Sequence, residues 1–84
     1  MRTPRTDQTR RADAFKEAAF TSRMAEEARN RARAAWKDAK ARGCHPDQLR
    51  ALEVQAAVTH SRATAAATLE DEAWRNYAAT LPHG

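Results

Sequence analysis

The chain of 84 residues is poor in the residues that cross-link a fold, turn it sharply or fill a large core. It has one cysteine, two glycines, three prolines, two tryptophans, two phenylalanines and one tyrosine. A single cysteine cannot form an internal disulfide, which is typical of proteins in a reducing compartment. Two glycines leave no Gly-rich loop to cradle a phosphate group, so motifs of that kind are excluded.

Long apolar runs are missing as well. No run approaches the ~20 residues that cross a bilayer, and the arginines near the N-terminus are not followed by the apolar stretch of a secretory signal. We therefore expect a soluble, cytoplasmic protein that does not contact membranes. The preference for alanine and arginine over lysine and isoleucine is typical of GC-rich bacterial or phage genomes.

Alanine is the residue that the chain has in excess, with 21 copies. Together with arginine, lysine and glutamate it favours helix. Burying an alanine methyl stabilises little, at roughly 25 cal/mol per Å², whereas ordering each residue costs about 1–2 kcal/mol of backbone entropy. A fold built on alanine should therefore be marginal alone, and we expect self-association or another partner.

The few helix breakers divide the chain into two long helices. Thr6 or Asp7 can cap the start of the first helix, and no glycine or proline follows until Gly43. Gly43 suits the left-handed position after a helix, and Pro46 suits the first turn of the next. The sequence predicts one all-α domain, 1–84, folded as an antiparallel helical hairpin. A basic arm at 1–6 precedes the first helix at 7–42. A turn at 43–45 leads to the second helix at 46–80, and a tail follows at 81–84.

Small residues mark the expected contact between the helices. Stripes of coiled-coil spacing, alternately three and four residues, occur in both halves, which predicts an alanine-rich seam. In the first helix the stripe is Ala14, Ala18, Thr21, Ala25, Ala28, Ala32, Ala35 and Ala39. In the second it is Leu49, Leu52, Ala56, Thr59, Ala63, Ala66, Glu70, Ala73 and Tyr77.

The predicted architecture is similar to that of the plasmid-encoded hairpin dimers that bind RNA and control copy number, and more loosely to secreted two-helix proteins with a Trp-x-Gly turn. The turn Arg42-Gly43-Cys44-His45-Pro46 contains no Trp-x-Gly, and no other residues match either group. The likeness is one of fold, which implies little about function.

A second apolar stripe runs along the second helix, away from the seam. It consists of Val54, Val58, Ala65 and Leu69. One neighbouring helix cannot cover both stripes, so a homodimeric four-helix bundle is the simplest solution. The alternative is that these are scattered apolar residues in contact with water, which is common.

Positive charge is concentrated in the first half of the chain. Residues 1–42 carry a net charge of +6 and residues 43–84 a net charge of −2. A ridge of cations faces away from the alanine seam, and others lie in the arm: Arg29, Arg33, Lys37 and Lys40, with Arg2 and Arg5. Such a row could bind a nucleic-acid backbone. The alternative is that the halves attract each other and the remaining charge is solvated.

Catalytic and metal chemistry have little support. Cys44 and His45 are adjacent, but no CxxC accompanies them and the other histidines are distant, so we predict no metal site and no cofactor. No nucleophile lies near a plausible base, so no catalytic residue is assigned. A helix-turn-helix is a weaker alternative, because Pro46 falls where that motif buries an aliphatic residue and the helices are too long.

The sequence therefore predicts a small non-catalytic accessory or regulatory protein of bacterial or phage type. The first hypothesis is binding of nucleic acid through the basic ridge. The alternative is a protein–protein interaction module, such as an inhibitor, an antitoxin-like partner or an assembly adaptor. It would dock as a helix in a groove through the second apolar stripe.

Overall fold

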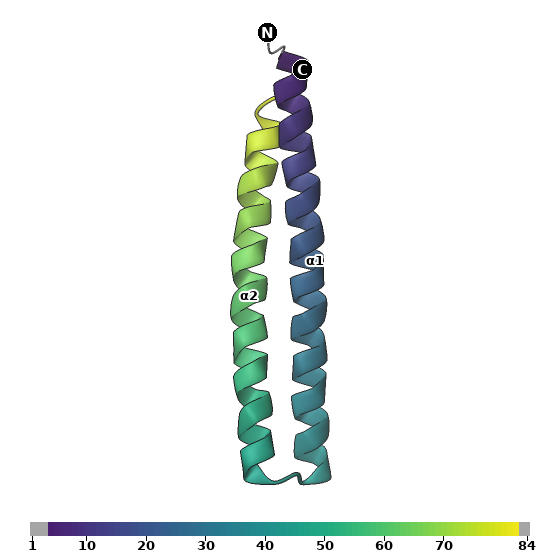
Figure 1. Ribbon diagram of the computed structural model, residues 1–84, viewed down its shortest axis with the longest axis vertical. Helices are drawn as coiled ribbons and strands as arrows, with labels where there is room; N and C mark the ends of the chain where they lie inside the picture. Colours follow the sequence, from purple (N-terminus) through teal and green to yellow (C-terminus); the bar gives the residue numbers. More distant parts are fainter. Residues whose placement is uncertain (1–3, 83–84) are drawn as a thin grey trace.

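The computed structural model describes residues 4–82, and the side chains of residues 7–82. Helix α1 runs from Pro4 to Arg42 and helix α2 from Pro46 to Ala78. They lie side by side and antiparallel, with the start of α1 extending past the end of α2 (Figure 1), in a rod with extents of 62 × 27 × 13 Å. The described chain contains no strand. The predicted all-α hairpin is confirmed.

Helix α1 begins earlier than the sequence predicted. Its first residue is Pro4, because proline already has helical φ and its missing N–H would have no partner in the first turn. The predicted cap at Thr6 or Asp7 is therefore wrong, and residues 4–6 are helical rather than part of an arm. Asp7 instead lies inside the first turn and pairs with Arg11 at 3.2 Å. Residues 1–3 of the predicted arm lie outside the described residues.

The turn uses glycine and proline as expected. Gly43 has a φ of +70°, and its N–H donates to the Lys40 carbonyl at 3.2 Å. The Cys44 N–H donates to the Ala39 carbonyl at 3.1 Å. This pair of bonds is a Schellman motif, which satisfies carbonyls at the end of α1. Pro46 then opens α2, and Nδ1 of His45 accepts the Asp47 N–H at 3.2 Å as the helix cap.

Helix α2 ends at Ala78, two residues before the predicted end. The Thr80 N–H donates to the Tyr77 carbonyl at 2.9 Å and the Leu81 N–H to the Ala78 carbonyl at 3.1 Å. These tighter i→i+3 bonds close the helix just before Pro82, which lacks an N–H to continue it.

The seam of α2 is as predicted. All nine positions of the stripe are buried or half-buried. Thr59, Ala63 and Ala66 are the most enclosed, at 5–7% exposed. The Thr59 hydroxyl donates to the carbonyls of Gln55 at 2.9 Å and Ala56 at 3.1 Å. Its own helix thus satisfies the polar group that the seam buries.

The predicted seam of α1 is wrong at three of its eight positions. One row of the predicted stripe does face α2, namely Ala18, Ala25, Ala32 and Ala39. In the other row of the stripe, three residues are exposed: Ala14, Thr21 and Ala35. The row that begins one residue after Ala14 is half-buried instead: Phe15, Ser22, Arg29 and Trp36. The two candidate stripes share one row of alanines. Rotating α1 toward the phenylalanine and the tryptophan buries more apolar area than rotating it toward alanine.

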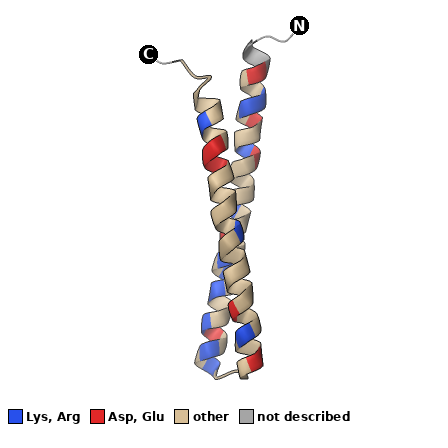
Figure 2. Cartoon of the chain, turned by 90° about the vertical axis from the view of Figure 1, so that its left-hand side faces the viewer, with Lys and Arg blue, Asp and Glu red and all other residues tan. Residues whose placement is uncertain are grey.

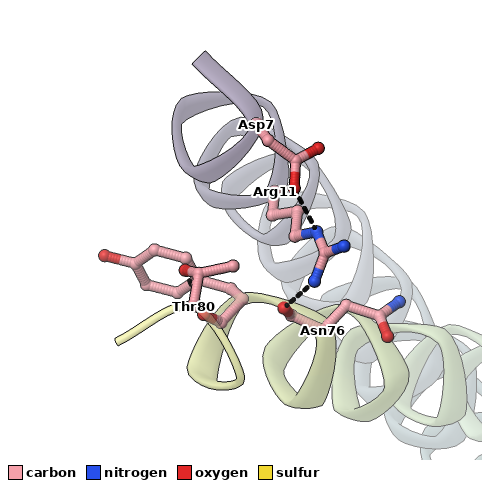
Figure 3. A network of polar contacts seen from close by, with 5 residues as sticks. Asp7, Arg11, Asn76 and Thr80 are labelled. Carbon is pink, nitrogen blue, oxygen red and sulfur yellow. Dashed lines mark hydrogen bonds and ion pairs between the residues drawn. The ribbon is translucent and has the colours of Figure 1, made fainter. Parts of the chain in front are cut away.

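The interface between the helices is thin. Its buried residues are alanines and one threonine, and no described side chain is less than 2% exposed. At the open end three rings form a cluster, with Phe15 to Trp74 at 5.2 Å, Phe15 to Tyr77 at 6.3 Å and Trp74 to Tyr77 at 6.0 Å between centroids. Arg11 also joins the ends there, because its guanidinium donates to the Asn76 carbonyl at 3.1 Å (Figure 3).

Candidate functional site

The described part of the chain offers two surfaces on opposite sides of the hairpin. Within residues 4–82 no group of three His, Cys, Asp or Glu side chains could hold a metal ion. Neither α1 nor α2 contains a stretch long and apolar enough to cross a bilayer. The first surface is basic and lies near the turn, and the second is an apolar groove between the helices.

The basic face consists of Arg33, Lys37 and Lys40, with Trp36 between them. All three cations are exposed. Figure 2 shows lysine and arginine gathered on the part of the hairpin near the turn. Arg33, Trp36 and Lys37 line a shallow hollow against Glu53 of α2. The Lys40 ammonium lies 4.9 Å from the centre of the Trp36 ring. The ring is half-buried and in contact with a cation, which leaves little of its face for other stacking.

Arg29 does not belong to this row as the sequence suggested. It occupies a seam position, is half-buried and pairs with Glu26 at 3.4 Å. Its Nε is buried without a hydrogen-bond partner. The same rotation of α1 that buries Trp36 also turns Arg29 toward α2.

The two predicted arm cations cannot be placed. Arg2 lies outside the described residues. The backbone of Arg5 belongs to α1, but its side chain lies outside the described part. The structure thus brings together Arg33, Lys37 and Lys40 and no other predicted cation.

The groove face lies on the other side of the hairpin. One hollow is lined by Ala14, Glu17, Ala18, Thr21, Ala66 and Leu69. A second is lined by Thr21, Met24, Ala25, Ala28, Thr59, Arg62 and Ala66. Because both include Thr21 and Ala66, they form one continuous groove between α1 and α2. Its floor is mostly alanine, so the backbone of another helix could approach the backbones of α1 and α2 closely.

Large apolar side chains stand exposed beside this groove. Leu69 is 60% exposed and Met24 44%. Phe20, 61% exposed and two residues from both Ala18 and Ser22 of the seam, lies instead on the outer face of α1, away from α2. Of the other predicted partner-binding residues, Val58 and Ala65 are exposed one row farther out on α2. Val54, two residues from both Leu52 and Ala56 of the seam, points away from α1. The four residues therefore do not form one contact surface, and Leu69 is the one that lines the groove.

Sequence reasoning missed the α1 wall of the groove. The alanine stripe predicts Ala14 and Thr21 in the seam, and Glu17 belongs to neither surface that the sequence predicts. The available signal was the pair Phe15 and Trp36, which are 21 residues apart and therefore lie in one heptad row. A seam defined by the row of Phe15 and Trp36, rather than by the alanine stripe, places Ala14 and Thr21 beside the seam.

Comparison with protein-family models, with curated proteins and with solved structures finds no match to this chain.

Proposed function

We propose that the hairpin is a non-catalytic binding module whose basic face contacts the phosphate backbone of nucleic acid. The observation that carries this proposal is that none of Arg33, Lys37 and Lys40 pairs with a carboxylate in the described part of the chain. Arg11, Arg42 and Arg75, in contrast, each pair with an aspartate on their own helix. Composition further supports a bacterial or phage regulatory protein that acts in the cytoplasm.

The spacing of the three cations fits a polyanion. Arg33 to Lys40 spans about 10 Å of helix, along which duplex DNA carries several phosphates, at one per ~1.7 Å. Contacts of this kind position a protein without reading sequence. We therefore expect binding that is independent of sequence and strongly weakened by salt.

Titration of fluorescent mixed-sequence DNA and RNA at several salt concentrations tests the proposal. Lys37→Gln should weaken binding and reduce the slope of log K against log salt by about one. Arg33→Gln together with Lys37→Gln should reduce it by about two. Arg75→Gln is the matched control, because it removes one charge at the opposite end of the hairpin. Undetectable binding at low salt, or equal loss in the Arg75 variant, would contradict the proposal.

The groove face favours a second candidate function, docking of another protein. Its support is the set of exposed apolar side chains beside an alanine floor, which a helix could cover. A capture experiment should then lose its bound protein on Leu69→Asp, and retain it on Ala57→Asp, a change at an exposed residue on the other side of α2.

We also propose that the hairpin forms a homodimeric four-helix bundle through the groove face. The thin alanine interface supports this, since each hairpin alone buries few large side chains. Packing two groove faces together would remove Met24 and Leu69 from water. Such a dimer leaves the basic face of each hairpin outside.

A further inference from the structure

A row of residues along α1 borders the groove face and has a repeating charge pattern. Glu17 and Met24 line the groove, and residues seven positions apart on packed helices fall in the same row. The row is Arg10, Glu17, Met24, Arg31 and Asp38. Its charges are positive, negative, neutral, positive and negative. If a second copy of this row is laid against the first in the opposite direction, with Met24 against Met24, each positive residue faces a negative one. The row is therefore complementary to itself about Met24.

We infer that a second copy of the chain covers the groove face in antiparallel orientation, with α1 against α1 of the partner and the two-fold axis near Met24. The inference rests on the proposed dimer and specifies its geometry. Glu17 then faces Arg31 of the partner subunit, and Arg10 faces Asp38 of the partner subunit. Two-fold symmetry makes each of these contacts occur twice.

The parallel orientation lacks this complementarity. It would place α1 against α2 of the partner at the same level along the rod. The contact of Phe15 with Trp74 shows which residues of α1 and α2 lie at the same height along the rod. By the same alignment, Glu17 lies level with Glu72, and Arg31 lies level with Val58. A parallel dimer would therefore set Glu17 against Glu72 of the partner subunit and leave Arg31 against an apolar side chain. Like-charge contacts disfavour a wrong arrangement.

The charges of the row are available for such contacts. Glu17 and Arg31 form no ion pair within the described hairpin. Asp38 pairs with Arg42, but both side chains are well exposed, so exchange of that partner costs little. Exposed pairs contribute little affinity each, but they are sufficient to select one orientation of an apolar interface.

The apolar residues also have the arrangement of an interface core. Met24 and Ala65 lie at the same level, near the two-fold axis, with Leu69 a turn away. The charged residues of the row lie toward both ends. An apolar centre with a polar rim is the usual anatomy of protein interfaces.

Charge exchange at Glu17 and Arg31 tests the orientation. The dimer dissociation constant is measured by sedimentation equilibrium at low salt. Glu17→Arg alone should weaken the antiparallel dimer about tenfold, since two attractions become repulsions, and Arg31→Glu alone should do the same. Combining both changes should restore the affinity. In a parallel dimer Glu17→Arg would instead face Glu72 and strengthen association, which would overturn the inference.

The single cysteine gives an independent measurement that needs no substitution. Cys44 lies at the turn, 20 residues from Met24. Spin labels on the two copies of Cys44 should be about 60 Å apart in the antiparallel dimer, at 1.5 Å per residue, and close together in the parallel one. A short distance would overturn the orientation alone. A monomeric mass at high concentration would overturn the dimer as well. Neither result changes the proposed binding of nucleic acid, because every residue of the basic face is retained.

Discussion

Arg29 shows how one residue can have an unfavourable environment within a regular fold. The seam requires a small or apolar residue at its position, which Ser22 and Trp36 supply one heptad before and after. Arg29 satisfies part of its guanidinium through Glu26, but its Nε is buried without a partner. A buried polar group without a hydrogen bond destabilises the folded state.

Replacing Arg29 with methionine should therefore stabilise the hairpin. Methionine keeps an unbranched side chain as far as the position of Nε and removes the unpaired donor, so we expect the free energy of unfolding to rise by about 1 kcal/mol. Urea unfolding followed by circular dichroism measures the change. Arg33→Met, at an exposed position with no unpaired buried atom, is the control and should change stability by less. A loss of stability in the Arg29 variant would show that the pair with Glu26 outweighs the unpaired atom.

The two helices differ in how well their sequences specify their faces. In α2 the stripe includes Leu49, Leu52 and Tyr77, which occur in one pair of heptad rows, so the seam could be predicted completely. In α1 the alanines of the stripe occupy two adjacent rows, and an alanine stripe by itself cannot define the rotation of the helix. The half-buried Phe15 and Trp36 define the rotation of α1 instead. The same rotation explains why Arg29 lies in the seam rather than in the basic ridge, and why Ala14 and Thr21 line the groove.

The aromatic cluster holds the two helices together at the open end, where no loop joins them. A double-mutant cycle with Phe15→Leu and Trp74→Leu should reveal a coupling of roughly 0.5–1 kcal/mol, at the lower end for ring pairs because Trp74 is 43% exposed. Unfolding free energies of the two single variants, the double variant and the parent chain supply the cycle. Strict additivity would mean that the rings contribute only through the area they bury.

At the scale of the whole molecule, the hairpin is a single layer of two helices. Each helix buries only the side that faces the other helix, and its remaining faces are exposed to solvent. A layer of this kind stabilises itself weakly, and covering its groove face would add the apolar contacts that the seam lacks. Overall shape could be predicted from the breakers at Gly43 and Pro46, whereas the groove could not, because it depends on the rotation of α1.

Thermal stability should therefore depend on protein concentration. If a second copy binds the folded hairpin, a tenfold rise in concentration should raise the melting temperature by a few degrees. Leu69→Lys, at a residue already 60% exposed in the hairpin, should remove this dependence without unfolding the chain. Ala57→Lys, on the other side of α2, should leave it intact. A melting temperature that stays constant over a hundredfold range of concentration would argue against self-association.

The position of both ends of the described chain at one end of the rod (Figure 1) has a mechanical consequence. A force that pulls Pro4 and Pro82 apart acts across the seam rather than along it. The helices would peel apart one turn at a time, starting at the rings of Phe15, Trp74 and Tyr77 and ending at Gly43. The resisting force at any moment is that of a single layer of contacts, so tethering by its ends would make the hairpin a soft link. The same rod held at the turn and at one end would be far stiffer.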